Sequence, residues 1–177
     1  MNIVFGTDGW RGIIARDFTY DNLAKVATAT ANYITRIGDK NPSAVIGYDT
    51  RFMSKEFAEE TARVFASHGI TVHLTQDISS TPQVSFHTKQ KGSILGIVIT
   101  ASHNPGEYNG IKLSDGKNSL FGEHIQEIRQ LIENGEFASG SGTTNDADIR
   151  KDYIQFLKDN LNIKPGLRIA VDYGNGM

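Results

Sequence analysis

Apolar side chains recur along the chain at two different spacings. At the spacing of an α-helix, about every third or fourth residue, they mark five segments. These predicted helices cover residues 20–37, 55–68, 81–89, 125–132 and 149–161. Ser54 is a plausible N-cap for the second helix, and Pro82 is tolerated because it falls in the first turn of the third.

Short apolar or alternating runs mark the predicted strands. They cover residues 44–48, 70–74, 94–100, 110–113 and 167–172. The N-terminal stretch 5–12 is too rich in glycine to be predicted as regular structure. Because strands alternate with helices, the sequence predicts an α/β fold: a layered α/β/α domain with a mixed, mostly parallel sheet.

The last part of the chain differs from the rest. Residues 135–147 are rich in Gly, Ser and Thr, which is typical of an exposed loop or linker. We therefore expect a first domain over residues 1–140 and a linker with a helix over 141–164. Residues 165–177 read as the first strand of a second, truncated α/β domain, because a buried strand needs neighbours on both sides. The alternative is a terminal strand that folds back onto the first sheet.

Composition and charge exclude several classes of protein. The 18 basic and 20 acidic residues give a net charge of -2, which argues against a nucleic-acid partner bound through bulk charge. The absence of cysteine excludes disulfides and thiolate metal sites. No apolar run approaches the roughly 18 residues of a membrane span, and the N-terminus lacks the pattern of a signal peptide. We expect a soluble, cytoplasmic protein with neither a nucleic acid nor a membrane as partner; its oligomeric state is not readable.

The candidate chemistry begins where the predicted strand 94–100 ends. Ser102 follows this strand directly, in a loop whose proline and glycines could let backbone amides converge on an anion. Its neighbours can all donate hydrogen bonds to phosphate oxygens: Thr100, His103, Asn104 and Lys112. The plainer interpretation is a polar loop residue that caps a turn.

A serine hydrolase is the competing enzyme class for Ser102. The motif G-x-S-x-G is absent. His103 follows Ser102 directly, and adjacent side chains of extended backbone point to opposite faces. His103 is therefore expected to act on a substrate rather than on Ser102. The other histidines show no metal-ligand spacing and are expected to be structural or exposed.

Two further stretches carry polar groups suited to phosphate. In FGTDGWRG, residues 5–12, glycines allow a ligand to approach the backbone, and Arg11 offers a planar fork. The alternative is an N-terminal loop with an Asp8–Arg11 pair. Arg51 follows the predicted strand 44–48, at the end of the sheet where ligands collect in α/β folds. Neither a P-loop nor a G-x-G-x-x-G turn after a strand is present.

Three motifs in this order resemble the α-D-phosphohexomutase superfamily. They are FGTDGWRG (5–12), GYDTR (47–51) and TASHNPGEYNGIK (100–112). This superfamily includes phosphoglucomutases, phosphomannomutases and phosphoglucosamine mutases. The resemblance covers essentially the whole chain, with residues 1–140 similar to the first of four domains and 165–177 to the start of the second.

The resemblance implies a mechanism. Ser102 is carried as phosphoserine, and a phosphoryl group moves between the 1- and 6-positions of a hexose phosphate through a bound bisphosphate. It also implies Mg2+, with an oxygen of phosphorylated Ser102 as a ligand, and an activator of the glucose 1,6-bisphosphate type. The implied catalytic residues are Ser102, His103, Lys112 and Arg11. The implied substrate- or phosphate-binding residues are Thr100, Asn104, Asp8 and Arg51.

The chain also departs from the family pattern. The family's three aspartate metal ligands, its sugar-recognition loop and its phosphate-clamping loop have no counterpart here. The resemblance therefore implies that this chain alone is inactive as a mutase. The alternatives are a free-standing sugar-phosphate-binding module without turnover and, less well matched, the serine hydrolase. The sequence does not indicate which hexose phosphate is used.

Overall fold

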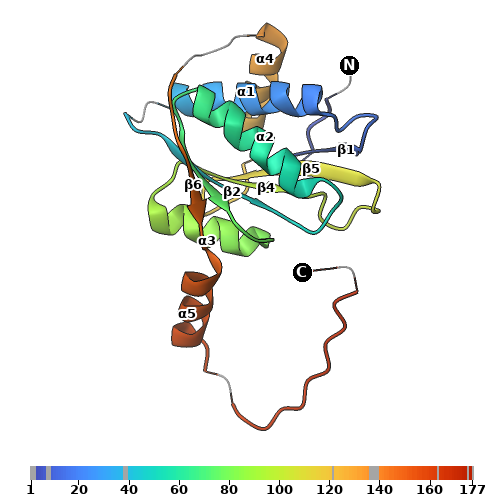
Figure 1. The fold of residues 1–177 in the computed structure, drawn as a ribbon, viewed down its shortest axis with the longest axis vertical. Helices are drawn as coiled ribbons and strands as arrows, with labels where there is room; N and C mark the ends of the chain where they lie inside the picture. The colour runs from blue at the N-terminus through green and yellow to red at the C-terminus, as the bar shows by residue number, and fades with distance from the viewer. Residues whose placement is uncertain are drawn as a thin grey trace.

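The sheet of the protein has six strands in the order β1–β5–β4–β2–β3–β6 (Figure 1). The structure, a computed structural model, describes residues 3–6, 9–37, 40–120, 122–135, 140–162, 164–174 and 176. The strands are β1 (Gly9–Ile13), β2 (Ser43–Tyr48), β3 (Thr71–Thr75), β4 (Leu95–Ile99), β5 (Tyr108–Ser114) and β6 (Thr144–Ala147). Strands β4, β2, β3 and β6 run parallel, whereas β5 is antiparallel to β4 and β1 to β5. The predicted mixed, mostly parallel sheet is confirmed.

Helices cover both faces of this sheet. They are α1 (Tyr20–Arg36), α2 (Ser54–Ser67), α3 (Thr81–Lys91), α4 (Glu123–Asn134) and α5 (Arg150–Asn160). Figure 1 shows α1 and α2 on one face and α3 on the other, with α5 beyond α3. None of the helices in the described ranges is long and apolar enough to cross a lipid bilayer. The layered α/β/α architecture expected from the sequence is confirmed.

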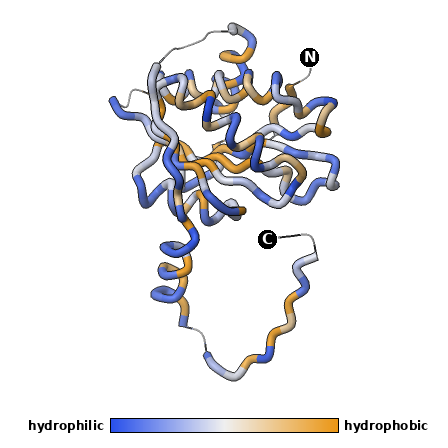
Figure 2. Tube along the Cα trace, in the orientation of Figure 1, coloured by the Kyte–Doolittle hydropathy of each residue, from blue (hydrophilic) through white to orange (hydrophobic). Residues whose placement is uncertain are grey.

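The main core lies between the sheet and the pair α1 and α2. Its aromatic centre consists of Trp10, Phe18 and Phe57, with ring centroids 4.7 Å apart for Trp10–Phe18 and 4.9 Å for Phe18–Phe57. Figure 2 shows hydrophobic residues concentrated in the central strands. On the other face, Val84 of α3 packs with Val98 of β4 in a smaller cluster. Burial on both faces explains why β4 is a continuous apolar run.

Strand β1 corrects the expectation that residues 5–12 lack regular structure. Gly9–Ile13 pairs with β5 along its whole length. The glycines serve close contact between the two strands: a Cβ on Gly9 would lie 2.0 Å from the carbonyl oxygen of Ile111, and one on Gly110 would lie 2.6 Å from that of Trp10. Gly9 of this stretch and Gly110 of β5 therefore allow a tightly packed edge ladder.

Strand β6 corrects part of the predicted linker. Residues 144–147 pair in parallel with β3 and extend the sheet by one strand. Their exposure is typical of an edge strand, since only Ala147 is buried. The polar composition that predicted a linker reflects this edge position.

The start of α2 also differs from the prediction. Ser54 is the first helical residue, and the N-cap position is taken by Met53 with a left-handed φ of 60°. The hydroxyl of Ser54 donates to Oδ1 of Asp49 at 2.7 Å. Ser54 is thus part of a polar network at the end of β2 and does not cap the helix with its side chain.

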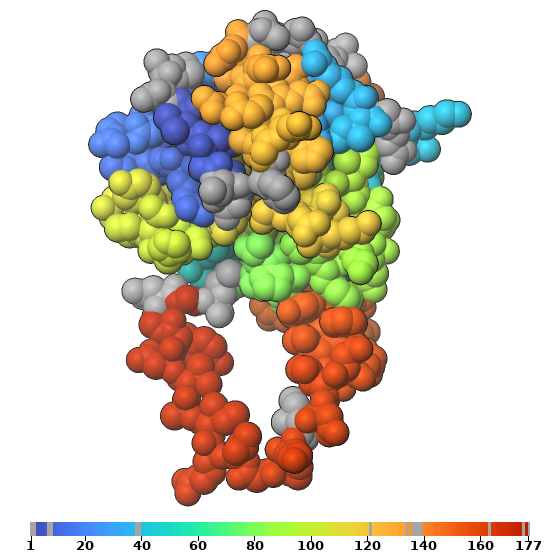
Figure 3. Space-filling model, turned by 180° about the vertical axis from the view of Figure 1, so that it is seen from behind, coloured from blue at the N-terminus to red at the C-terminus, as the bar shows by residue number. Residues whose placement is uncertain are grey.

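The strand predicted over 167–172 is not formed. Its apolar residues Leu167, Ile169 and Val171 are 77, 76 and 60% exposed, and no described strand pairs with them. Figures 1 and 3 show this segment leading away from the body beyond α5 and turning back toward it. An apolar alternation cannot form a strand without a partner for its backbone groups. The alternative of a strand added to the first sheet is likewise not observed, and the expected division of the chain into domains stays a prediction.

Candidate active site

The ends of β2 and β4 bring two polar segments together. The strands are parallel neighbours with Tyr48 opposite Ile99, so that Asp49 and Thr100 leave the sheet at the same edge. The amide of Asp49 donates to the carbonyl of Ile99 at 3.1 Å. A cavity of about 930 Å3 opens at this edge, lined by the segment after β2, the segment after β4, the N-terminus of α3 and Gly176. Its position at the carboxyl ends of parallel strands is where α/β folds bind ligands.

Ser102 stands at the tip of the segment after β4, which we call the serine loop (residues 101–107). The side chain is exposed and lines the cavity. Its backbone has a left-handed φ of 58°, a conformation that a residue with a Cβ adopts at a cost. The amide of Ser102 donates to Oγ1 of buried Thr100 at 2.9 Å, and the amide of Thr100 donates to the carbonyl of Gly110 at 2.9 Å. The loop thus presents a hydroxyl to the cavity from a fixed backbone.

The conformation of Ser102 changes the relation expected for His103. The sequence predicted opposite-facing side chains on extended backbone. Because Ser102 is left-handed instead, Nδ1 of His103 lies 3.4 Å from Oγ of Ser102. The two side chains are therefore neighbours, at a distance near the long limit of a hydrogen bond. His103 lines the same cavity.

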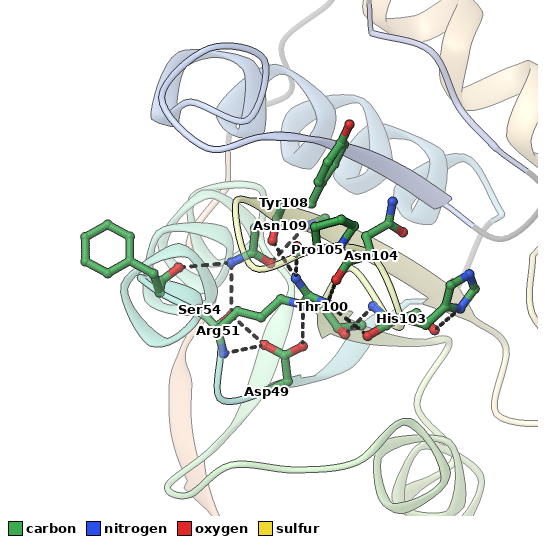
Figure 4. A network of polar contacts seen from close by, with 12 residues as sticks. Asp49, Arg51, Ser54, Thr100, His103, Asn104, Pro105, Tyr108 and Asn109 are labelled. Atoms are coloured by element: carbon green, nitrogen blue, oxygen red, sulfur yellow. Dashed lines mark hydrogen bonds and ion pairs between the residues drawn. The ribbon is translucent and has the colours of Figure 1, made fainter. Parts of the chain in front are cut away.

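The guanidinium of Arg51 donates hydrogen bonds to backbone carbonyls of the serine loop (Figure 4). One terminal nitrogen donates to the carbonyl of Ser102 at 2.9 Å and to that of Asn104 at 2.6 Å. The other donates to the carbonyls of Pro105 at 2.8 Å and Tyr108 at 2.9 Å. In this structure the guanidinium therefore contacts the backbone of the serine loop. Its expected contact with phosphate stays a prediction.

Three buried side chains support this arrangement: Asp49 after β2, Ser54 at the start of α2 and Asn109 in β5. Oδ1 of Asp49 accepts from the hydroxyl of Ser54 at 2.7 Å, and Nδ2 of Asn109 donates to that hydroxyl at 2.9 Å (Figure 4). None of the three was predicted as a site residue: Asp49 was noted only within the GYDTR motif and Ser54 only as an N-cap. A signal existed for Asn109, because an amide side chain interrupts an otherwise buried strand, and buried polar groups need partners.

The N-terminus of α3 forms the opposite side of the cavity. Ser80 and Thr81 line it, and the amide of Ser80 donates to Oε1 of Gln83 at 2.8 Å as part of a capping box. Burial raises the pKa of Tyr48, whose protonated hydroxyl donates to the carbonyl of Gln76 at 2.9 Å and fastens the preceding loop. The positive end of the helix dipole favours an anion on this side.

Arg11 and Lys112 share one face of the sheet. Arg11 is paired with Gly110, and Lys112 lies two residues further along β5. Residues paired across a ladder, or two apart on a strand, point to the same face. Trp10 and Ile111, between them, are buried in the main core, so the two cations lie on the face away from α1 and α2. Neither is among the described residues that line the cavity.

The other predicted binding residues have different placements. Thr100 and Asn104 both line the cavity. The amide of Asn104 donates to the carbonyl of Ala101 at 3.1 Å and closes the turn at Ser102. Asp8 lies outside the described residues. The structure therefore brings Ser102, His103, Thr100 and Asn104 together around one cavity.

The described ranges contain no cluster of three acidic, histidine or cysteine side chains that could hold a metal ion. The carboxylate of Asp49, which lines the cavity, is already engaged by Ser54 and Arg51. These residues by themselves do not make up a Mg2+ site. The expected ligand from this chain, a phosphate oxygen on Ser102, stays a prediction.

Comparison with known proteins identifies relatives over nearly the whole chain. The family model described as phosphoglucomutase/phosphomannomutase, alpha/beta/alpha domain I, matches residues 2–139. A phosphoglucosamine mutase of Caldicellulosiruptor bescii is 33% identical over 99% of this chain and 41% of its own length. A phosphoglucomutase of Neisseria meningitidis is 33% identical over 94% of this chain and 36% of its own length. The chain thus spans about two fifths of the length of these curated relatives.

Solved structures agree with the sequence relatives. A protein assigned as a phosphomannomutase from Thermus thermophilus superposes with a TM-score of 0.83 at 34% identity, over 90% of this chain and 36% of its own. A phosphoglucomutase/phosphomannomutase family protein from Burkholderia thailandensis gives a TM-score of 0.79 at 24% identity, over 89% and 35% of the two chains. The second comparison, at its lower identity, shows the shared fold alone.

Proposed function

Because this chain belongs to the phosphoglucomutase/phosphomannomutase family, we propose that it is the domain that carries the phosphoryl group of a hexose-phosphate mutase. The observation that supports this most directly is Ser102, an exposed hydroxyl held at the cavity by a backbone in a left-handed conformation. A nucleophile of this kind has to be reachable by substrate and fixed in direction, because phosphoryl transfer depends mainly on positioning and charge stabilisation.

The proposed reaction consists of two transfers. In the first, the bond between phosphorus and Oγ of phosphorylated Ser102 breaks, and a bond to a hydroxyl oxygen of the hexose phosphate forms. The sugar hydroxyl loses its proton to a base, Oγ of Ser102 regains a proton, and the product is a bound hexose 1,6-bisphosphate. In the second transfer Oγ of Ser102 loses its proton to a base and bonds to the other phosphorus; the bond from that phosphorus to the sugar oxygen breaks, and the sugar oxygen takes up a proton. The net result moves phosphate between the 1- and 6-positions.

The remaining catalytic roles fall to nearby polar side chains. His103, whose Nδ1 lies 3.4 Å from Oγ of Ser102, is proposed to move the proton at this oxygen or at the sugar hydroxyl. Lys112 and Arg11, on one face of the adjoining strands, are proposed to offset the charge of about -1.5 to -2 on each phosphate. Thr100 and Asn104 are proposed to donate hydrogen bonds to phosphate oxygens from the cavity wall.

Mg2+ and a bisphosphate activator complete the proposal. The ion, when bound, neutralises phosphate charge, and it prefers oxygen ligands. Since the described residues do not form a metal site, this chain would contribute one oxygen of phosphorylated Ser102. An activator of the glucose 1,6-bisphosphate type would place the first phosphoryl group on Ser102. We further propose that the site binds a hexose phosphate and that the protein is located in the cytoplasm.

We also propose that this chain alone does not turn over. The lack of a metal-binding cluster in the described residues supports this, and it equally favours the second candidate, a sugar-phosphate-binding module. A coupled mutase assay with hexose 1-phosphate, Mg2+ and a hexose 1,6-bisphosphate distinguishes the mutase from the binding module. The assay compares this chain with the native protein, by which we mean the complete product of its gene. Activity in the native protein that disappears in the Ser102→Ala variant supports the mutase. Binding of hexose phosphate by a native protein without turnover would favour the module.

A further inference from the structure

The guanidinium of Arg51 contacts its own chain through all three of its nitrogens. A guanidinium has five N–H donors. Four contacts reach the backbone carbonyls already described, and Nε lies 3.4 Å from Oδ2 of Asp49. The two side chains are only 13% and 9% exposed. Both terminal nitrogens thus donate to backbone carbonyls and Nε faces a carboxylate, so the guanidinium is directed at its own chain.

The carbonyls that Arg51 binds surround the reactive residue. Those of Ser102 and Asn104 flank His103, and those of Pro105 and Tyr108 close the loop where it enters β5. The left-handed conformation of Ser102 carries an energetic cost that its surroundings must offset. Charge-assisted hydrogen bonds, which are stronger than those between neutral groups, can offset it.

The carboxylate of Asp49 faces the guanidinium through Oδ2, 3.4 Å from Nε, and it also fixes the backbone that carries Arg51. Oδ1 of Asp49 accepts from the amide of Arg51 at 3.0 Å and from the hydroxyl of Ser54 at 2.7 Å. The side chain of Asn109 joins this network from β5, the strand that follows the serine loop. The network therefore ties the segment after β2 to both ends of the serine loop.

From this geometry we propose that Arg51 is a positioning residue for phosphoryl transfer. Oriented by Asp49, it sets the backbone of the serine loop so that Oγ of Ser102 points into the cavity, and it does not bind phosphate. The proposal rests on the proposed function as far as catalysis is concerned. Its structural part, that Arg51 holds the loop, stands on the contacts alone and is tested separately.

The structural part is tested by amide hydrogen exchange on the 177-residue chain. An ammonium group cannot satisfy four carbonyls spread around a planar fork, so Arg51→Lys keeps the charge but loses the clamp. We expect the amides of Ser102 and Asn104 to exchange about tenfold faster or more. Amides of β2 and β4 should be unchanged. The matched control is Arg63→Lys, since Arg63 forms a bidentate contact with Glu60 on the exposed side of α2.

Equal exchange at these two amides in Arg51→Lys and in the control would overturn the proposal. Should Arg51→Lys fail to fold, Asp49→Asn provides the second variant. It leaves the guanidinium in place but removes the carboxylate that orients it, and faster exchange confined to the serine loop is again expected. Loop exchange that stays at the wild-type value in a folded Asp49→Asn protein would count against the proposal.

The catalytic part is tested by steady-state kinetics of Arg51→Lys in the native mutase. A displaced nucleophile lowers kcat, and misplacement of about 1 Å costs roughly 100-fold. KM for the hexose phosphate should change by less than about twofold, because no binding contact is lost. A raised KM with unchanged kcat would identify Arg51 as a phosphate ligand and overturn the proposal. A wild-type protein without mutase activity would instead refute the proposed function, and loop exchange would then decide the role of Arg51.

Discussion

Ser102 has an exposed hydroxyl and a left-handed backbone conformation, which is unfavourable for a residue with a Cβ. The left-handed region costs a residue with a Cβ roughly 1–2 kcal/mol. Oγ is nonetheless kept at the cavity, within 3.4 Å of Nδ1 of His103. Such local strain is retained where the surrounding structure determines it, often at functional sites. Replacement of Ser102 by glycine should therefore relieve the backbone strain and also remove the function of the hydroxyl.

The prediction compares two substitutions of Ser102. Both Ser102→Ala and Ser102→Gly remove the hydroxyl, so both should abolish phosphorylation and mutase turnover. Glycine adopts a positive φ without strain whereas alanine does so at a cost, so the free energy of unfolding should be about 1 kcal/mol larger for Ser102→Gly than for Ser102→Ala. Chemical denaturation measures the difference. Equal stability would show that this position is not strained, and sustained turnover in either variant would show that the phosphoryl carrier lies elsewhere.

A second prediction concerns Arg11 of β1 and Lys112 of β5, which lie on one face of the sheet. Arg11→Ala and Lys112→Ala should each lower the rate of phosphoryl transfer more than they lower stability. The physical reason is that phosphate charge must be offset during transfer, whereas polar substitutions outside a core usually cost within about 0.5 kcal/mol. Mutase kinetics and denaturation of the same variants provide the comparison. A large loss of stability with full activity in the remaining folded protein would show both cations to be structural.

Arg51 illustrates how far sequence reasoning reached at the site. Its position after an apolar strand placed it correctly at the cavity edge. Its partners are backbone carbonyls 51 to 57 residues further along the chain, and a carbonyl has no sequence signature. The orientation of His103 was mispredicted for a related reason, because the positive φ of Ser102 could not be read from a serine in a loop.

Among the elements, long amphipathic helices and buried strands were predictable and edge strands were not. Strands β2 and β4 were recognisable by continuous apolar runs that are buried on both faces. Strand β1 contains two glycines, and β6 consists largely of polar residues, so neither has the expected strand composition. Both form because a neighbouring strand offers backbone partners, which is a tertiary and not a local cause.

The close contact between β1 and β5 gives a prediction at the scale of elements. In Gly9→Ala the new Cβ would meet the carbonyl oxygen of Ile111 at 2.0 Å, on a residue with φ of 148°. We expect a loss of roughly 1–3 kcal/mol in the free energy of unfolding, the range for overpacking. Gly106→Ala is the matched control, because a Cβ there has no neighbour within 4 Å and no unusual φ. Equal effects of the two variants on the denaturation midpoint would contradict the proposed close packing.

For the whole molecule, buried histidine on α3 predicts a pH dependence of stability. Burial, followed by the charge of Lys91, lowers the pKa of His87 below its ordinary value of 6.5, while Asp152 acts in the opposite direction. The unfolded chain therefore takes up a proton that the folded chain does not, as the pH falls below 6.5. Stability should decrease in this window by up to about 1.4 kcal/mol per pH unit. The slope is measured by denaturation at several pH values.

The variant His87→Gln tests the assignment of this slope. Glutamine does not titrate, so the part of the pH dependence that belongs to His87 should disappear below pH 6.5. His124→Gln serves as the comparison. His124 lies on α4, and its Nδ1 shares a hydrogen bond of 2.7 Å with the hydroxyl of Tyr33. An unchanged slope in His87→Gln would place the titrating group elsewhere in the protein.

The central claim for the molecule as a whole is that Ser102 carries the transferred phosphoryl group. The most direct measurement is mass spectrometry of the peptide containing Ser102, taken from native protein that has been treated with a hexose 1,6-bisphosphate. The account predicts one added phosphoryl group on Ser102, which is lost to the sugar when hexose monophosphate is added. An active mutase whose Ser102 never gains this group, or whose phosphoryl group stays on Ser102 during turnover, would contradict it.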